Sequence, residues 1–381
     1  MQKTAFLKIL TVATVLFLLF FLANLMVESG QIPDNQDILG YFNSTNWVFG
    51  TGTLYKDVLS EYPLLANLVF SLVRLLTFNL NQSPLTFALI WVGFNSILFS
   101  GVVISILELN KEDSVSNELL TLFAWLMPST IFFALLRYDI YPATTTLIMM
   151  WSLRNEKWLL ASIWLGITIA LKGYAIFLLP TLFVYLLYRE SLKQAIISTV
   201  ISLMPFTFGI IIIFFFAGID GAIYPIKFHA IREINSDSSY QIIRYYLIPN
   251  LRVIDLYGTP FLFQIFTAIL GAYFRPKNFQ ELVNSLAFVI LGFVTFSIFY
   301  SPQFLMWFLP ILCFSSSQKI RQAVFLYALT TMGYLIFLAN PTFLIFKSLI
   351  TGLTVLRFYL MWLLYWNIRK GRISDSAEVV K

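Results

Sequence analysis

The sequence is poor in charge, since only 12% of its 381 residues are Asp, Glu, Lys or Arg. A typical soluble domain carries about 25%. So little charge cannot cover a water-exposed surface, which excludes an ordinary soluble globular protein. The hydrophobic residues, 59% of the chain, form continuous blocks of about 15–25 residues, the length that crosses the ~30 Å core of a bilayer. These blocks lack the alternation of barrel strands, so we predict an all-α polytopic membrane protein.

Cysteine and histidine occur only once each, as Cys313 and His229. One cysteine excludes an internal disulfide and a cysteine-built metal site. The chain also lacks a linker rich in Pro, Gly or Ser and any short-period repeat. We therefore predict one membrane domain over residues 1–372, followed by a polar, disordered tail at 373–381. The net charge of +6 sits mostly in short loops, as membrane orientation requires, so nucleic acid is not an expected partner.

The apolar blocks predict twelve membrane spans. They lie at about 6–27, 84–107, 119–137, 140–153, 158–171, 173–188, 195–217, 259–274, 281–299, 302–314, 320–338 and 342–366. The first block follows Lys3 and Lys8 and so resembles a signal peptide. Its apolar run is longer than a signal-peptide core and no small-residue cleavage site follows it, so we interpret it as a retained helix.

Basic loops predict the orientation, because Lys and Arg concentrate on the cytoplasmic side. On this map they fall on one side, at Lys3, Lys8, Lys111, Arg154, Lys157, Arg189, Lys193, Arg275, Lys277, Lys319, Arg321, Arg369, Lys370 and Arg372. Both termini are then cytoplasmic, and loops 28–83 and 218–258 face outward. Residues 62–80 are apolar but contain Arg74, and counting them as a span would break the alternation. We predict an interfacial or re-entrant helix there.

With this topology the unusual polar residues gather on the outer face. They are Asp34, Asp37, Asp57 and Glu61, then Arg137, Asp139 and Lys172, and then Lys227, His229, Arg232, Glu233, Asp237, Arg244, Arg252 and Asp255. Ionisable residues at membrane depth are costly and indicate a functional site. Carboxylates can act as a general base toward a hydroxyl, and Arg and Lys can hold a phosphate. A phosphate at the membrane surface implies a lipid phosphate.

Four stretches carry a resemblance to a known group, and a weaker fifth follows. They are Asp37 to Tyr41 with Gly52, Tyr55 and Glu61-Tyr62-Pro63; Arg137-Tyr-Asp139 to Pro142; Gly166 to Lys172-Gly-Tyr174; His229 and Arg232 with Asp237-Ser238 and Tyr240; and Ser301-Pro-Gln303 to Trp307. In this order they resemble the GT-C superfamily of membrane glycosyltransferases, closest to glycosyltransferase family 87 and its mannosyltransferase relatives. Leu64 departs from the family's second proline.

The resemblance implies a GT-C-type bundle of about 12 transmembrane helices with outer-face interfacial helices. It implies inverting transfer of a single sugar, with mannose favoured, from a polyprenyl-phosphate donor to a lipid-linked or glycan acceptor on the outer membrane face. The first-loop base carries over to Asp37, with Asp34 as the alternate. We expect His229, Arg232 and Lys172 at the donor phosphate. Further expected substrate contacts are Tyr41, Tyr55, Tyr62, Arg137, Asp139 and Arg244.

No ligand spacing calls for a cofactor, although some superfamily members bind a divalent cation, which Asp37 and Asp139 could hold. Plainer structural roles stand beside these functional ones. Asp37 can cap a helix, Lys172 can extend to the interface, and the tyrosines can anchor the chain there. The alternative functions are a multi-pass secondary transporter, which should show internal repeats and midplane charges, and a lipid-phosphate flippase, which needs the cationic loop without Asp37.

Overall fold

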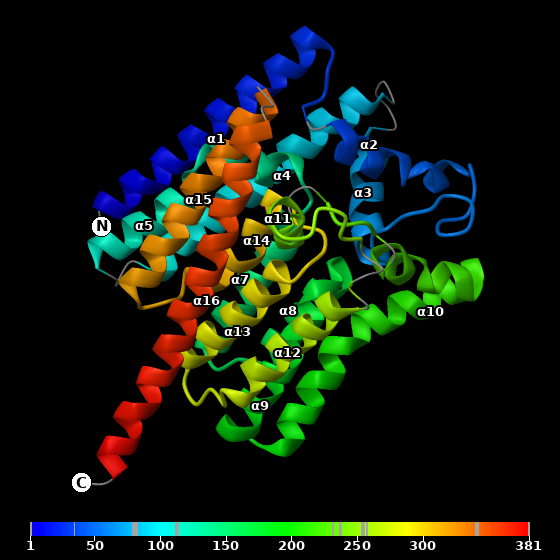
Figure 1. Ribbon diagram of the computed structural model, residues 1–381. Helices are drawn as coiled ribbons and strands as arrows, with labels where there is room; N and C mark the ends of the chain where they lie inside the picture. Colours follow the sequence, from blue (N-terminus) through cyan, green and yellow to red (C-terminus); the bar gives the residue numbers. More distant parts are fainter. Residues whose placement is uncertain are drawn as a thin grey trace.

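The computed structural model describes residues 2–33, 35–77, 83–110, 114–230, 232–235, 238–252, 256, 258–339 and 343–379. Over these residues the chain is a helical bundle (Figure 1) without β-strands, with a single isolated bridge between Leu54 and Val58. The prediction of an all-α protein is confirmed. Asp34, the alternate base, lies outside the described residues.

Among the described residues, four helices are long and apolar enough to cross a membrane. They are α1 (Gln2–Ser29), α4 (Pro84–Leu109), α10 (Leu192–Ala230) and α16 (Phe343–Val379). The pair α5 (Val115–Leu126) and α6 (Pro128–Leu136) makes a fifth if the two helices, bent by 51°, form one span. These features support a membrane protein.

Shorter helices complete the bundle. They are α2 (Asn35–Asn43), η1 (Asn46–Phe49), α3 (Leu64–Leu76), α7 (Ile140–Arg154), α8 (Trp158–Leu171), η2 (Gly173–Leu178), α9 (Leu179–Arg189), α11 (Ser239–Tyr246), α12 (Thr259–Tyr273), α13 (Phe279–Thr295), η4 (Pro302–Phe304), α14 (Leu305–Leu312) and α15 (Gln318–Ala339). At 1.5 Å per residue, the 13-residue α3 is about 20 Å long, shorter than the ~30 Å bilayer core.

Helix boundaries follow local chemistry. Ser83 caps α4 by accepting from the Thr86 amide, and Pro84 occupies its first turn, where no backbone donor is needed. Asn278 caps α13, because its Oδ1 accepts from the Glu281 amide at 2.9 Å and its Nδ2 donates to the Glu281 carboxylate at 2.8 Å. Most predicted spans match observed helices to within a few residues.

Two helices extend beyond the predicted limits. α10 passes its expected end at residue 217 and continues to Ala230, with a non-helical Gly218 (φ 71°, ψ −172°) between its two parts. α16 continues to Val379, where the polar composition of 373–381 had suggested a disordered tail. Hydropathy alone missed both extensions, because it reports where a chain is apolar and not where it is helical.

The two ends of the bundle differ. The N- and C-termini lie toward one end in Figure 1, and α2 and α3 lie toward the other. The end near the termini is fastened by surface pairs, Lys8 with Glu108 and Arg189 with Glu156. Near α2 and α3, the turns between helices carry charged side chains that are partly or fully buried. These side chains form the candidate site.

Candidate functional site

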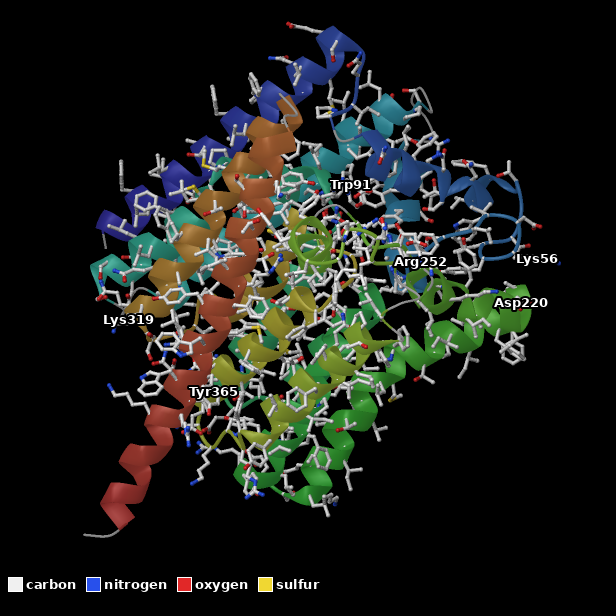
Figure 2. All side chains as sticks on the ribbon, viewed as in Figure 1. Lys56, Trp91, Asp220, Arg252, Lys319 and Tyr365 are labelled. Carbon is white, nitrogen blue, oxygen red and sulfur yellow. The ribbon has the colours of Figure 1, made fainter. Side chains whose placement is uncertain are left out.

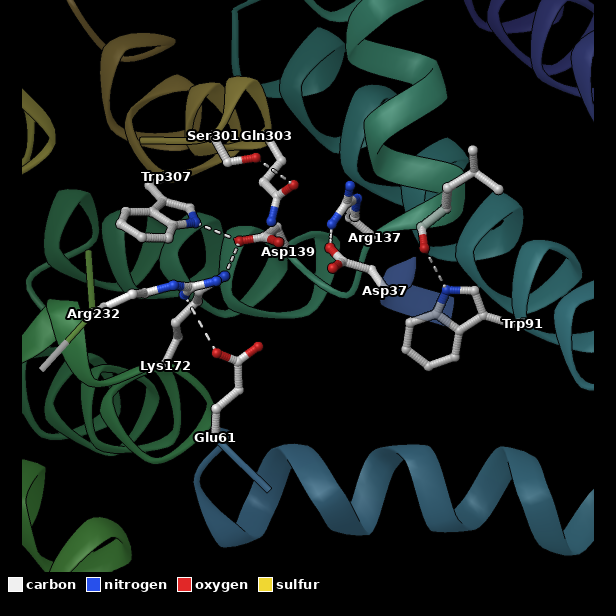
Figure 3. A network of polar contacts seen from close by, with 11 residues as sticks. Asp37, Glu61, Trp91, Arg137, Asp139, Lys172, Arg232, Ser301, Gln303 and Trp307 are labelled. Carbon is white, nitrogen blue, oxygen red and sulfur yellow. Dashed lines mark hydrogen bonds and ion pairs between the residues drawn. The ribbon is translucent and has the colours of Figure 1, made fainter. Parts of the chain in front are cut away.

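The residue predicted as the base, Asp37, stands in the first turn of α2 and forms an ion pair with Arg137 (Figure 3). Arg137 binds Oδ2 of the carboxylate. The Asp37 side chain keeps 27% of its surface exposed, so the group is accessible from outside the bundle. The Arg137 contact orients the carboxylate, and Oδ1 points away from that contact as a second acceptor.

Arg137 lies in a non-helical turn between α6 and α7, and side chains of α4 stabilise this turn. Its backbone is extended (φ −101°, ψ 151°), which ends α6. The last carbonyls of a helix have no intrahelical partner. Here the Trp91 indole donates to the Leu136 carbonyl at 3.0 Å, and the Asn95 amide donates to the Leu135 carbonyl at 2.8 Å. Two buried polar side chains of α4 thus stabilise a non-helical turn inside an apolar bundle.

Asp139, two residues beyond Arg137, is fully buried. Its Oδ1 accepts from the Lys172 ammonium at 2.5 Å and from the Trp307 indole at 2.5 Å. Its Oδ2 has no hydrogen-bond partner among the described residues. A buried carboxylate is stable only when it is paired and hydrogen-bonded. Lys172 and Trp307 meet that need on one oxygen and leave the other as a free acceptor.

Lys172 approaches Asp139 through an aromatic box. It stands at the break between α8 and η2, where the backbone is extended (φ −151°, ψ 111°). Its ammonium lies 4.4 Å from the Tyr138 ring centroid and 4.8 Å from that of Trp307. Such cation–π contacts stabilise a partly desolvated ammonium. Trp307 itself stacks on Tyr174 at 4.1 Å between ring centroids, which holds the box in place.

A third charged pair joins the loop before α3 to the segment after α10. Arg232 donates to Glu61 at 3.3 Å, and its guanidinium carbon lies 3.5 Å above the Phe299 ring. Both side chains of this pair are partly exposed, at 28% and 22%. His229 lies in the last turn of α10, within electrostatic range of Glu61, Arg232 and Lys172. The structure therefore brings all three residues predicted at the donor phosphate to one region.

The predicted tyrosines have structural roles around the site. The Tyr55 hydroxyl donates to the Tyr62 carbonyl at 2.6 Å and accepts from Asn67 at 2.8 Å. Burial raises the pKa of Tyr55 above its ordinary value, so the phenol remains neutral. Tyr41 is fully buried, stacked on Phe70 at 4.6 Å between centroids. The Tyr62 ring lies 5.1 Å from that of Tyr138, so it lines the aromatic box from the loop side.

Arg244 is the predicted residue that the structure does not bring into this group. It lies on α11, where it donates to Gln241 of the same helix at 3.3 Å. Glu61, the counter-charge of Arg232, was not predicted as a site residue, although the Glu61-Tyr62-Pro63 motif contained it. Trp307 was quoted only as the end of the weakest motif, and nothing local in the sequence marks it as a partner of Asp139.

Each carboxylate considered for a divalent cation has a basic partner, Arg137 for Asp37 and Lys172 for Asp139. In the part of the chain that the structure describes, no group of three or more His, Cys, Asp and Glu residues is positioned to hold a metal ion.

Comparison with models of known protein families gave no match to this chain. A search among curated proteins found no similar sequence either.

Proposed function

We propose that this protein is an inverting membrane glycosyltransferase of the GT-C type, which moves a single sugar from a polyprenyl-phosphate donor to a lipid-linked or glycan acceptor. One observation supports it above the others. Charged side chains from five separate segments gather at one end of the bundle: Asp37, Glu61, the pair Arg137 and Asp139, Lys172, and Arg232. A site with acceptors for a hydroxyl proton beside cations for a phosphate suits this reaction.

In this proposal Asp37 is the base. The acceptor hydroxyl donates a hydrogen bond to Asp37 and attacks the anomeric carbon on the face opposite the phosphate. The bond from that carbon to the phosphate oxygen breaks, the hydroxyl proton passes to Asp37, and the configuration at carbon inverts. The partial exposure of Asp37 and its fixed pairing with Arg137 support this role, because a base must be both reachable and oriented.

The departing polyprenyl phosphate would be bound by Arg232, His229 and Lys172. The Arg232–Glu61 contact is long and partly exposed, so a phosphate can replace Glu61 at the guanidinium with little loss. Lys172 has three ammonium donors, and Asp139 accepts from the ammonium through a single oxygen. Lys172 can therefore hold Asp139 and a phosphate oxygen together.

A groove on the flank of the bundle fits the lipid tail of the donor. It lies between α1 and α4, with a volume of about 630 Å³ and an almost wholly apolar lining that includes Leu19, Ile90 and Gly101. Both flanking helices are candidate membrane spans, so the groove would open to the acyl region of the bilayer. Ile90 adjoins Trp91, which contacts the break that carries Arg137.

The proposal includes about 12 spans, outer-face helices α2, α3 and α11, and cytoplasmic termini. Its finer membrane topology rests on the distribution of Lys and Arg. The short apolar helices α7, α8, α12 and α13 would then cross the bilayer inside the bundle, where short helices can tilt or be shielded by longer neighbours.

A transfer assay tests the function. Membranes containing the full chain are incubated with radiolabelled polyprenyl-phosphate mannose, glucose or arabinose, and label is followed into lipid and glycan fractions. We expect one donor, mannose first, to yield labelled product above membranes that lack the protein. Donor lipid that binds or changes leaflet without any sugar transfer would instead favour the flippase, and uptake of a solute without transfer would favour the transporter.

A further inference from the structure

One buried arginine belongs to none of the charged pairs described above. Arg357, in the part of α16 that is a candidate membrane span, has no exposed surface. One of its terminal nitrogens, Nη2, donates to Ser239 Oγ at 2.9 Å and to Thr354 Oγ1 at 2.7 Å. The other two, Nε and Nη1, are buried without a hydrogen-bond partner among the described residues. The guanidinium carbon lies 4.1 Å from the Tyr300 ring centroid.

Among the described residues, no carboxylate compensates the charge of Arg357. A guanidinium does not lose its proton in proteins, and burial of an unpaired charge is costly. In the part of the chain that the structure describes, every ion pair joins other residues, and no carboxylate lies within 4.0 Å of Arg357. Hydroxyl groups and a ring do not neutralise it. An arginine kept at membrane depth under these conditions indicates a missing anion.

The surroundings of Arg357 also favour an anion. Ser239 is the first residue of α11, and Ser238 caps that helix. The N-terminus of a helix presents free amides and a partial positive charge. Tyr300 is held in place by Asn235, which donates to its carbonyl and accepts from its amide at 3.0 Å. The guanidinium is therefore aimed at a helix N-terminus and backed by a fixed ring.

We infer that Arg357, with Ser239 and Thr354, binds an oxyanion of the phosphate class. Nε and Nη1 supply donors that a tetrahedral oxyanion can accept, and the fork of a guanidinium favours phosphate over a single-point ligand. Among the described residues, Arg357 shares no hydrogen-bond, ion-pair or ring partner with Lys172 or Arg232, and the inference does not depend on the proposed sugar transfer. The source of the phosphate is either a lipid headgroup or a soluble phosphate compound.

Ligand-induced thermal stabilisation tests the inference. The full chain is placed in nanodiscs of phosphatidylcholine, and its melting temperature is followed against inorganic phosphate and pyrophosphate, and separately in nanodiscs that also contain phosphatidic acid. We expect at least one of these anions to raise the melting temperature of the wild type. Arg357→Lys keeps the charge but loses the fork, so binding should weaken on the order of tenfold or more. Arg357→Gln should abolish the rise.

Lys347→Gln is the matched control. Lys347 lies on the same helix, and its ammonium is 4.0 Å from the Tyr246 ring of α11, so this variant removes a charge from the same helix pair. It should keep the full response. A rise with pyrophosphate or phosphate alone identifies a soluble ligand, and a rise with phosphatidic acid alone identifies a lipid headgroup. The inference is overturned if none of these anions raises the melting temperature. It is also overturned if the rise is equal in the wild type and in Arg357→Lys. The second comparison remains decisive even if Arg357→Gln does not fold.

Discussion

The charged residues of the site occur in pairs of different character. Asp139 and Lys172 form a pair in which the carboxylate is fully buried and also held by an indole. Glu61 and Arg232 are partly exposed and joined by one contact at 3.3 Å. The Asp139–Lys172 pair suits a permanent structural role, since breaking it would leave a charge in an apolar interior. The Glu61–Arg232 pair can be exchanged for a ligand, because exposed pairs contribute little to stability.

Asp139→Asn is therefore expected to destabilise the protein strongly. The substitution leaves the Lys172 ammonium buried without its counter-charge, which costs about 3–5 kcal/mol when one partner of a buried pair is lost. Thermal unfolding of the purified protein in detergent measures this loss of stability. The double variant Asp139→Asn with Lys172→Met should recover part of the loss, because it removes the orphaned charge as well.

The matched control for that prediction is Glu156→Gln. Glu156 pairs with Arg189 at 2.6 Å on the opposite end of the bundle, and both side chains are exposed. Its loss should leave the unfolding temperature unchanged within error. A wild-type melting temperature for Asp139→Asn would refute the buried-pair interpretation.

At the residue scale, the sequence allowed the charged members of the site to be chosen but not their partners. Asp37, Arg137, Asp139 and Lys172 stood out because ionisable groups are rare in this chain. Their pairings depend on which helix breaks face one another, and no local pattern encodes that. Arg357 was overlooked, although an arginine inside the apolar run 342–366 is the kind of signal that marks intramembrane sites.

At the scale of the elements, the site exists because helices end inside the bundle. The breaks at Arg137 and Lys172 expose backbone groups that α4 side chains and neighbouring turns satisfy. The sequence predicted both breaks as gaps between short apolar blocks. It did not predict the extension of α10, because the chain becomes more polar after Gly218 while remaining helical. Close contacts between neighbouring helices then hold these turns in position relative to one another.

Gly166→Ala tests one such contact. A β-carbon at Gly166 of α8 would meet the Ser202 carbonyl of α10 at 2.9 Å and the Pro205 ring at 3.0 Å. The backbone and the proline cannot move aside cheaply, so overpacking should cost about 1–3 kcal/mol. The change is measured as a lower thermal midpoint in detergent.

Gly101→Ala on α4 is the control, because a β-carbon there meets nothing within 4 Å. Alanine forms helices better than glycine by about 1 kcal/mol, so this variant should be at least as stable as the wild type. Equal behaviour of the two variants would mean that α8 and α10 do not pack as closely as described.

At the scale of the whole molecule, the bundle has two ends of different chemistry. Helical class and most helix positions followed from hydropathy, because long apolar blocks have few other uses. The side of the membrane on which each end lies rests on the basic loops, and it is open to a direct test. The single cysteine, which is buried, makes that test simple.

Cysteine labelling of intact cells tests the orientation. In a Cys313→Ala background, Lys56→Cys and Asp220→Cys place thiols on exposed residues in the loop before α3 and at the Gly218 bend of α10, and Lys319→Cys places one at the opposite end (Figure 2). A membrane-impermeant maleimide should label the first two in intact cells and the third only after permeabilisation. The reverse pattern would place the charged site on the cytoplasmic side.

The most direct measurement of the central claim compares sugar transfer by Asp37→Asn with transfer by Asp220→Asn in the same membranes. Loss of a general base lowers a rate by about 10²–10⁴-fold, so Asp37→Asn should lose transfer by that factor at an unchanged protein level. Asp220→Asn changes an exposed carboxylate just after the Gly218 bend of α10 and should transfer at the wild-type rate. Full activity of Asp37→Asn would contradict the claim that this carboxylate takes the acceptor proton.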